Sequence, residues 1–451
     1  MTKPEIDFEG VEFGDKRLSK RLKASIENFR KSAGKSILSS GESRSSAKGF
    51  YRLLSNEKFE CEKLEEAEKT ATKARLSNIG GHVLFIQDTS DIDLNGHKKT
   101  KGLGYCSEHI RGIKLHSCIA TSIEGVPLGL MGQYYETRKE AKSTLTKAEK
   151  AARPIEEKES YRWLEMLKNS TKDLPENVTA ITICDREGDF YELYAKALEL
   201  KQKFIIRVRR NRNGADNEKI VKKLRNKTTS TEVIINIPRD TRRGVSARTA
   251  KMEVTYITVD LPKSASVNDA TLPAMLTINI VRIAEINTPD GEEPIEWILA
   301  TNLTLNDNNE AMTIVEYYVI RWRIERFHFV LKSGLNAEKI QQRTYEKIKP
   351  VLLIYSVIAL YIMAITYLGK TTPEMSCDLV FDDDEWKILY RVANKTKVPP
   401  DSPYTIAEAL QYLGQIGSFK RSPSGGYPGV KAIWLGLNSL YHTMDLLVGQ
   451  V

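Results

Sequence analysis

A run of 19 uncharged residues, VLLIYSVIALYIMAITYLG at 351–369, limits most strongly how this chain can fold. A helix of this length that is apolar on every side must lie either inside a large protein core or across a bilayer. Pro350 precedes the run, and Lys349 and Lys370 flank it. The sequence has no second run of this kind, and 28% of its residues are charged. We therefore expect a buried core helix rather than a membrane span, and no membrane partner.

The length and the cysteine pattern indicate an intracellular protein of several domains. A chain of 451 residues is long enough for two to four domains, each with its own core. The N-terminus has no apolar segment of the length that a signal peptide needs. The cysteines form neither a CxxC motif nor another metal-ligand spacing, which argues for a reducing compartment and against a zinc site. They are Cys61, Cys106, Cys118, Cys184 and Cys377. We expect a cytoplasmic location.

Positive charge is concentrated near the N-terminus. Residues 16–52 hold eleven lysines and arginines against two acids, whereas residues 371–451 hold seven basic and nine acidic side chains. Such a local excess suits a polyanionic partner, although a solvated helical face is the other explanation. The C-terminal region shows no such preference.

The chain divides into three predicted regions. Residues 1–75 read as a small helical domain, because apolar residues recur at helical spacing between basic ones over 14–33. Residues 76–370 alternate apolar strands with helices, including a predicted helix over 155–169, which indicates an α/β fold with a mixed sheet. Between about 210 and 300 the pattern is all β and reads as an insertion. Residues 371–451 are predicted to be helical.

Two of the apolar strand patterns end in an aspartate. VLFIQDTSD places Asp88 after one strand, and ITICDREGD places Asp185 after another. Acids at the ends of neighbouring strands can converge on one point at the edge of a sheet and share a divalent cation. The alternative is that each aspartate caps the turn that follows it.

The segment YVIRWRIERFHFVLK, 318–332, carries more charge than a buried helix should. Tyr318, Arg321, Glu325 and Lys332 stand at i, i+3, i+7 and i+14. They fall within roughly 60° of one another on an α-helix, with His328 beside them. Aromatic residues alternate with these charges, which indicates burial on most sides, although an exposed face laced with ion pairs is the alternative. Buried charges need partners, and metal ions and phosphates would supply them.

The spacing Y-x2-R-x3-E-x6-K resembles the signature of bacterial cut-and-paste DDE transposases, in the Tn-five-like branch of the insertion-sequence-four group. CDREGD and RWRIERFH resemble the blocks around the second aspartate and the glutamate of that family, and EEPIEWILATN resembles the segment before its signature. FGDKRLSKRL and GKSI resemble its DNA-binding domain, and LGQIGSFKRS resembles its dimerisation region. Phe329 stands where the family would place a basic residue.

The resemblance implies an α/β chain with an RNase H-like catalytic domain, a β-rich insertion and helical terminal domains. Asp88, Asp185 and Glu325 would hold two Mg²⁺ ions, for which Mn²⁺ can substitute. The implied partners are the inverted repeats at the transposon ends and the target DNA, bound by a homodimer in the synaptic complex. The implied location is the bacterial cytoplasm, in association with the nucleoid.

The resemblance also implies a set of DNA contacts. Trp297 would stack on a base flipped out of the duplex, and Trp322 would fill the vacated place. The predicted phosphate and backbone contacts are Tyr318, Arg321, Lys332, Arg207, His328, Arg242, Arg243, Arg248, Arg17, Arg21 and Lys35. Two other functions stay open, namely a metal-dependent nuclease that cuts without joining and a DNA-binding regulator or inactive relic.

Overall fold

The computed structural model describes residues 4–8, 10–40, 43–141, 146, 149, 152–227, 230–237, 247–265, 267, 269–420 and 426–448. The chain forms two compact units. Unit 1 consists of Met1–Gly81, Thr89–Ser143 and Arg323–Val451, and unit 2 consists of His82–Asp88 and Thr144–Trp322. Unit 2 is therefore built largely from one excursion of the chain, whereas unit 1 joins segments that are distant in sequence.

The N-terminal helices of unit 1 pack through a single apolar stripe. Helix α1 spans Lys16–Lys31 and begins where the Asp15 side chain accepts a hydrogen bond from the Arg17 backbone N–H. Its buried face includes Leu18, Leu22 and Phe29, as the helical spacing predicts. Helices α2 (Ile37–Ser40), α3 (Arg44–Leu53) and α4 (Cys61–Ile79) follow. The Phe29 ring meets Phe50 of α3 edge-on, with the ring centroids 4.9 Å apart.

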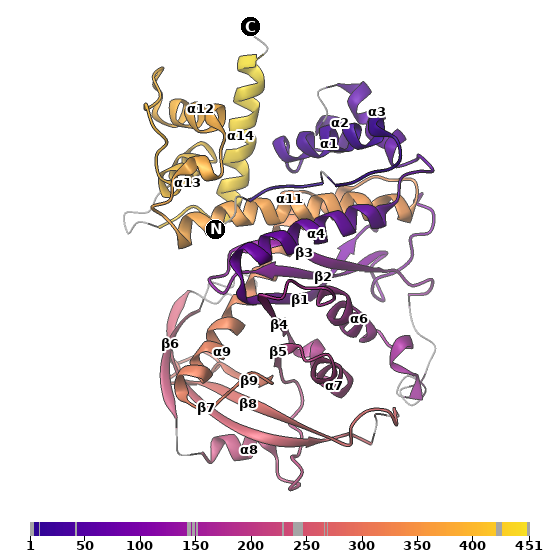
Figure 1. The fold of residues 1–451 in the computed structure, drawn as a ribbon, viewed down its shortest axis with the longest axis vertical. Coiled ribbons are helices and arrows are strands. Elements are labelled where there is room, and N and C mark those ends of the chain that lie inside the picture. The colour runs from indigo at the N-terminus through magenta and orange to yellow at the C-terminus, as the bar shows by residue number, and fades with distance from the viewer. Residues whose placement is uncertain are drawn as a thin grey trace. The chain divides into compact units, whose positions relative to one another are not determined.

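The long apolar run forms the central helix of unit 1. Helix α11 spans Tyr345–Thr371 and packs against α1, α4, α13, α14 and strand β3 (Pro127–Glu136), as Figure 1 shows. Within the described residues, α11 is the one helix long and apolar enough to cross a bilayer, and 94% of its most apolar window is buried. The run is thus a core helix, as its sequence predicts. Strand β3 pairs antiparallel with β2 (Gly112–Thr121), which neighbours β1 (Gly81–Asp93).

The C-terminal helices of unit 1 begin at well-formed caps. Helices α12 (Asp383–Asn394) and α13 (Ile406–Ile416) each start with a capping box, and α14 spans Val430–Val448. Arg30 of α1 reaches these helices and is largely buried. Its guanidinium donates to the Glu385 carboxylate of α12 and to the hydroxyls of Tyr361 and Tyr441, on α11 and α14. One buried charge therefore links the first helix of the chain to the last.

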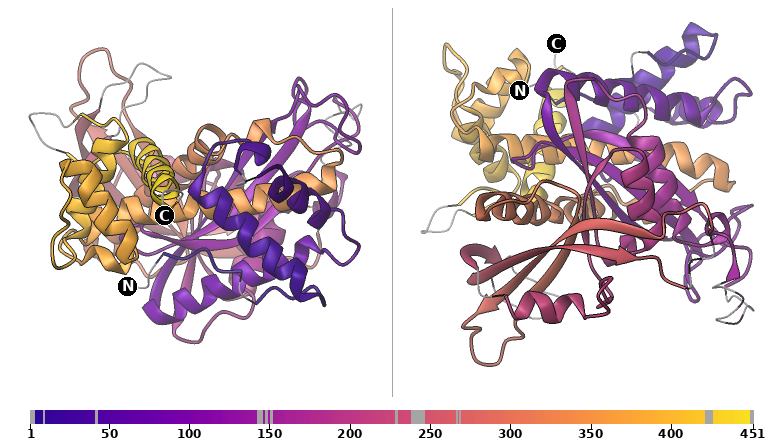
Figure 2. Two further views of the ribbon diagram at one scale, coloured as in Figure 1. Left: turned by 90° about the horizontal axis from the view of Figure 1, so that it is seen from above. Right: turned by 60° about the horizontal axis from the view of Figure 1, so that its bottom comes forward.

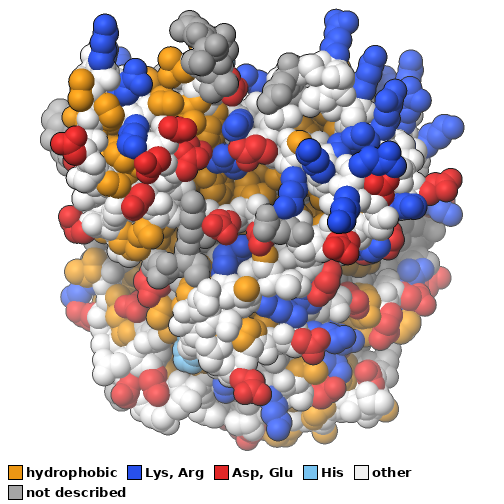
Figure 3. Space-filling view, turned by 45° about the horizontal axis from the view of Figure 1, so that its top comes forward, with side chains coloured by type: hydrophobic (Ala, Val, Ile, Leu, Met, Phe, Trp, Pro, Cys, Tyr) orange, Lys and Arg blue, Asp and Glu red, His pale blue; other side chains and the backbone are white. Residues whose placement is uncertain are grey.

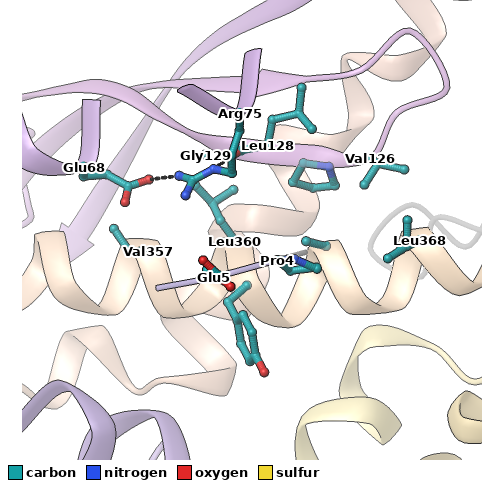
Figure 4. Close-up of a pocket in the computed structure, with 13 residues that line it drawn as sticks. Pro4, Glu5, Glu68, Arg75, Val126, Leu128, Gly129, Val357, Leu360 and Leu368 are labelled. Carbon is teal, nitrogen blue, oxygen red and sulfur yellow. Dashed lines mark hydrogen bonds and ion pairs between the residues drawn. The ribbon is translucent and has the colours of Figure 1, made fainter. Parts of the chain in front are cut away.

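A second buried ion pair lies under strand β3 of unit 1. The Glu68 side chain of α4 is 1% exposed, and one of its carboxylate oxygens accepts hydrogen bonds from Arg75 Nη2 and the Leu130 backbone N–H, both at 3.1 Å. Figure 4 shows this pair above the apolar side chains of α11. Gly129 lies so close to α4 that a Cβ there would stand 2.0 Å from Thr72 Oγ1. A larger residue at 129 would separate strand from helix.

Unit 2 is an open sheet whose strands run in the order β1-β4-β5-β9-β8-β7-β6, with β1 contributing residues 82–88. Strands β4 (Val178–Cys184) and β5 (Lys203–Arg207) are parallel, and β9 (Glu296–Thr301) pairs antiparallel with β5. Strands β6 (Thr231–Ile237), β7 (Arg248–Pro262) and β8 (Met275–Ile286) complete an antiparallel meander, visible in Figure 2. This meander is the predicted β-rich insertion.

Helices α6 (Tyr161–Ser170), α7 (Tyr191–Glu199) and α8 (Ile220–Arg225) bury their apolar faces on this sheet. One hydrophobic cluster of unit 2 joins Trp163 of α6 and Tyr194 of α7 to Phe204 of β5, all essentially inaccessible to solvent. Only part of the predicted helix over 155–169 is α-helical, because a short 3₁₀ turn, η1 (Ile155–Glu157), precedes α6.

Two sequence predictions about the charged segments need correction. Strand β1 does not end at Asp88 but continues to Asp93, because the alternating and β-branched residues that follow Asp88 extend the strand. The segment predicted as one helix is three, namely α9 (Asn308–Ile320), α10 (Trp322–Phe329) and a π-helical turn, η3 (Val330–Gly334). Asp307 caps α9, because its side chain accepts a hydrogen bond from the Glu310 backbone N–H. The regular 100° step between residues therefore does not extend to Lys332.

Candidate nucleic-acid and metal site

Asp185 stands where strand β4 ends, in a turn that holds its side chain in place. The Asp185 carboxylate accepts a hydrogen bond of 2.8 Å from the Glu187 backbone N–H and so caps a short 3₁₀ turn, η2 (Arg186–Gly188). A Cβ at Gly188 would come within 2.6 Å of the Cys184 Cβ. Only glycine allows the turn to fold this tightly against the end of the strand, which sets the direction of the aspartate.

Asp88 lies on the strand next to β4. Strands β1 and β4 are neighbours in the sheet, so this edge of unit 2 carries two acidic side chains. Arg321, which follows helix α9, places its Nη1 atom 3.9 Å from Asp88 Oδ2. The two side chains are 13% and 18% exposed, so the pair is half-buried and still reached by solvent. At 3.9 Å the contact is a loose ion pair rather than a close hydrogen bond.

Tyr318 gathers the remaining charges of this site around its hydroxyl. Burial raises the Tyr318 pKa, the Arg321 and Arg207 guanidiniums lower it, and Asp185 raises it. Burial lowers the pKa of Arg207, and the nearby cations Arg186 and Arg321 lower it further. Cations that repel one another in a half-buried place would be stabilised by an anion such as a phosphate.

An aromatic side chain borders this cluster. Trp297 of β9 meets the Tyr318 ring at a centroid distance of 5.5 Å and an angle of 65°. Trp297 and Trp322, the first residue of α10, are both only half-buried. Half-exposed indole rings beside a cluster of cations are able to stack on nucleobases.

Unit 2 therefore brings together six of the side chains that were predicted for the site. They are Asp88, Asp185, Arg207, Tyr318 and Arg321, with Trp297 at their border. Carboxylate oxygens are the ligands that Mg²⁺ and Mn²⁺ prefer, so the two aspartates fit a divalent metal in their chemistry. Across the described ranges, no group of three or more His, Cys, Asp or Glu side chains is gathered closely enough to hold an ion. The fit rests on the two aspartates.

Family profiles match nearly the whole chain. Residues 79–362 match the profile described as Transposase DDE domain, residues 5–59 match Transposase DNA-binding, and residues 357–445 match Transposase Tn5 dimerisation domain. The chain belongs to the Tn5-like DDE transposases. It is therefore a DNA transposase, an enzyme whose family cleaves and joins DNA with a divalent metal, and it binds DNA and forms a dimer.

One similar solved structure is also a transposase. It is described as a cryo-EM structure of a piggyBac transposase synaptic complex with hairpin DNA, and it shares 11% sequence identity with this chain. The match covers 98% of this chain and 76% of the other, at a TM-score of 0.35. A TM-score this low carries no weight for the details of the site.

The other signature residues of the transposase lie in unit 1. Glu325 is half-buried on α10, and Lys332 forms an ion pair with Glu338 at 3.6 Å. His328 is buried, and burial followed by the Lys332 charge lowers its pKa to about 3. The imidazole is therefore neutral at physiological pH and would reach DNA only as a neutral hydrogen-bonding group. Phe329, in place of the expected basic residue, packs on Trp434 of α14 at 5.8 Å.

The predicted contacts of the DNA-binding region are exposed. Arg17, Arg21 and Lys35 all lie at the surface, and Arg17 forms an ion pair of 3.2 Å with Asp15, which caps the same helix. Figure 3 shows lysines and arginines gathered over α1–α3, whereas acidic and apolar side chains dominate over α12–α14. This basic face is where the matched DNA-binding segment of the transposase presents its charge.

The predicted basic arm of the β-rich insertion is only partly described. Arg242 and Arg243 lie outside the described residues. Arg248, at the start of β7, pairs with Glu285 and with Glu292, and its side chain is 15% exposed. A guanidinium already held by two carboxylates would have to exchange them before it contacted a DNA phosphate.

Sequence reasoning missed Asp189, which lies four residues after Asp185 in the same CDREGD block. The Asp189 carboxylate is fully buried and accepts hydrogen bonds from the Arg209 and Arg210 backbone N–H groups, at 2.6 and 3.1 Å. It also accepts from the Arg212 guanidinium and from the Tyr194 hydroxyl. Asp189 thus ties the loop after β5 to the loop after β4. The only hint in the sequence was a second aspartate four residues after Asp185.

We expect Asp189→Asn to loosen this connection without unfolding the transposase. The amide keeps the size of the carboxylate but loses its charge, so bonds to Arg212 and to two backbone N–H groups weaken, by about 2 kcal/mol in all. Urea unfolding measures this loss. The exposed Glu199→Gln is the control, because Glu199 forms a surface ion pair with Lys196 on the same helix. Equal stability of both variants would show that the Asp189 contacts contribute nothing.

Proposed function

We propose that this transposase excises and inserts its DNA element by two-metal phosphoryl transfer, with Asp88, Asp185 and Glu325 as the metal ligands. The observation that carries the proposal is the gathering of Asp88, Asp185, Arg207, Tyr318 and Arg321 within unit 2. Two acids beside three phosphate-binding side chains are what a metal-dependent reaction at a phosphodiester requires. Glu325, on the helix that begins directly after Arg321, would supply the third carboxylate.

Two Mg²⁺ ions, when bound, would activate the attacking oxygen and stabilise the leaving oxygen. The protein's own part is to place the DNA. Arg207 and Arg321 would hold phosphate oxygens, and the Tyr318 hydroxyl would donate to the same backbone. Lys332 would add a further phosphate contact once it leaves Glu338. The ion pair between Arg321 and Asp88 is loose enough to open when a phosphate arrives.

We further propose that the cleaved transposon end passes through a hairpin. A hairpin at a duplex end requires one base to leave the stack, which costs a few kcal/mol. The indole of Trp297 would offset part of this cost by stacking on the flipped base, and Trp322 would occupy the vacated place. Trp297 is suited to this role because its ring is half-exposed and its position is held by Tyr318.

The organisation of the chain would serve this reaction. We propose that residues 1–75 recognise the inverted repeats, that 76–370 catalyse, and that 371–451 join two copies in the synaptic complex. The second copy would allow both element ends to be held together before insertion into target DNA. Such a reaction takes place on the bacterial nucleoid, in the cytoplasm.

The test is incubation of the transposase with DNA that carries the element's own ends and Mg²⁺, with products resolved on a denaturing gel. We expect nicked, hairpin and strand-transfer products. Nicked DNA without hairpin or joined product would favour a nuclease, and end binding without cleavage would favour a regulator. Either outcome contradicts the proposal.

The same assay tests the role of Trp297. We expect Trp297→Ala to keep first-strand nicking but to lose about tenfold in hairpin formation, because stacking is worth about 1–3 kcal/mol per base. Trp163→Phe, on α6 and distant in sequence from the signature, controls for the general loss of an indole. Equal loss at the nicking step would assign Trp297 to the core of the fold instead.

A further inference from the structure

Unit 1 carries a cluster of three cations outside the site described above. Arg323 of α10 lies over the Tyr367 ring of α11, with its Cζ atom 3.8 Å from the ring centroid, and donates from Nε to the Gly125 carbonyl at 2.8 Å. Lys370, in the last turn of α11, lies 5.6 Å from the same ring. One tyrosine therefore supports two cations, which fixes their positions.

The charges in this cluster are not neutralised by acids. Arg323 and Arg326 stand three residues apart on α10, so their side chains lie on one face of that helix. Burial lowers the pKa of Lys370, and the charges of Arg323 and Arg326 lower it further. No carboxylate contributes to this shift in the part of unit 1 that the structure describes. Arg326 and Lys370 are exposed at the surface. The three cations thus repel one another, and two of them face solvent.

The cluster does not share a helix face with Glu325. At about 100° per residue, Arg323 and Arg326 lie roughly 60° apart around α10, whereas Arg323 and Glu325 lie roughly 160° apart. A phosphate bound by Arg323 is therefore not the phosphate that reacts beside Glu325. Because Arg323 and Glu325 point to different sides of α10, the cluster would bind a separate stretch of DNA backbone.

We propose that Arg323, Arg326 and Lys370 form a second binding surface for the phosphate backbone of duplex DNA, with Tyr367 as its support. A polyanion is the occupant that the chemistry favours, because it removes the mutual repulsion of all three cations. The proposal goes beyond the signature contacts, since none of these four residues belongs to the Y-x2-R-x3-E-x6-K pattern. Two kinds of duplex carry such a phosphate backbone, namely the transposon end with its flanking DNA and the target DNA.

The salt dependence of binding tests this surface. For the unaltered dimer and for Arg326→Gln and Lys370→Gln, Kd is measured over a range of salt with an end-bearing duplex and with an unrelated duplex. Each substitution is expected to lower the slope of log Kd against log salt by about 0.9, and the double variant by about 1.8. Lys397→Gln, which removes an exposed charge between α12 and α13, is the matched control and should leave the slope unchanged.

The two duplexes and the sedimentation measurement distinguish transposon-end DNA, any DNA and a second copy of the chain as the binding partner. A change with the end-bearing duplex alone assigns the surface to the transposon end, and a change with both duplexes assigns it to any DNA, including the target. Arg326→Lys should restore the slope, since it restores the charge. Unchanged slopes with both duplexes would overturn the proposal. So would an altered dimer mass in sedimentation with unchanged slopes, because the surface would then bind a second copy of the chain.

Discussion

Asp185→Asn is expected to abolish cleavage and joining while leaving the fold and the binding of transposon ends intact. The amide is nearly the same size and can still accept the hydrogen bond from the Glu187 backbone N–H. It lacks the negative charge that a divalent metal needs. Loss of metal stabilisation worth about 4 kcal/mol lowers the rate by at least about 10³-fold. Product formation on end-bearing DNA with Mg²⁺ measures this loss.

The control for Asp185 must remove an acid without touching the site. Glu199→Gln removes an exposed carboxylate at the end of α7 and should cleave at the parental rate. End binding, measured without Mg²⁺, should be equal for both variants. An Asp185→Asn variant that still forms strand-transfer products would remove this residue from the catalytic set.

Arg75→Ala is expected to destabilise unit 1 by about 3–5 kcal/mol, because it leaves the Glu68 carboxylate buried without its cation. Glu68 is 1% exposed, and among the described residues one of its oxygens, Oε2, has no hydrogen-bond partner. The loss is read from urea unfolding. Lys63→Ala is the control on the same helix, since its ion pair with Glu60 is at the surface and contributes little.

The size of this loss should depend on pH. Burial raises the Glu68 pKa to about 7, against the lowering by Arg75, so the folded state binds a proton more tightly than the unfolded state does. Stability from this group is present at low pH and is lost as pH rises through about 7. The Arg75→Ala variant should therefore be least stable at pH 8. Adding Glu68→Gln should recover stability at pH 8, and failure to do so would contradict the ion-pair explanation.

The sequence predicted the fold well where one physical pattern dominated. The apolar run at 351–369 had to be a core helix, and the alternation between 210 and 300 predicted the antiparallel strands β6 to β9 but missed helix α8 near its start. The interruption at Arg321 was not predictable, because an α-helical pattern continues through it. The extension of β1 beyond Asp88 was missed for a similar reason, since polar residues conceal strand pairing on a partly exposed edge.

The sequence indicated which charged side chains form the candidate site, but not which residues hold the surrounding loops and helices in place. Tyr318, Arg321 and Asp185 stand out because charge at apolar positions needs an explanation. Asp189 does not stand out, because its role depends on backbone N–H groups some twenty residues further along the chain. The cations around Tyr367 were hidden for a related reason, since Arg323 and Lys370 come from helices whose packing no local pattern reveals.

The interleaving of the chain also sets an order for its synthesis. Helix α1 is made first, yet its buried Arg30 binds Glu385 and Tyr441, which lie near the end of the chain. The core helix α11, on which α1, α4 and β3 pack, is likewise translated late. Unit 2, mostly continuous from Thr144 to Trp322, has its main segment complete before α11 leaves the ribosome. The basic N-terminal helices can therefore complete their packing only after the end of the chain has been translated.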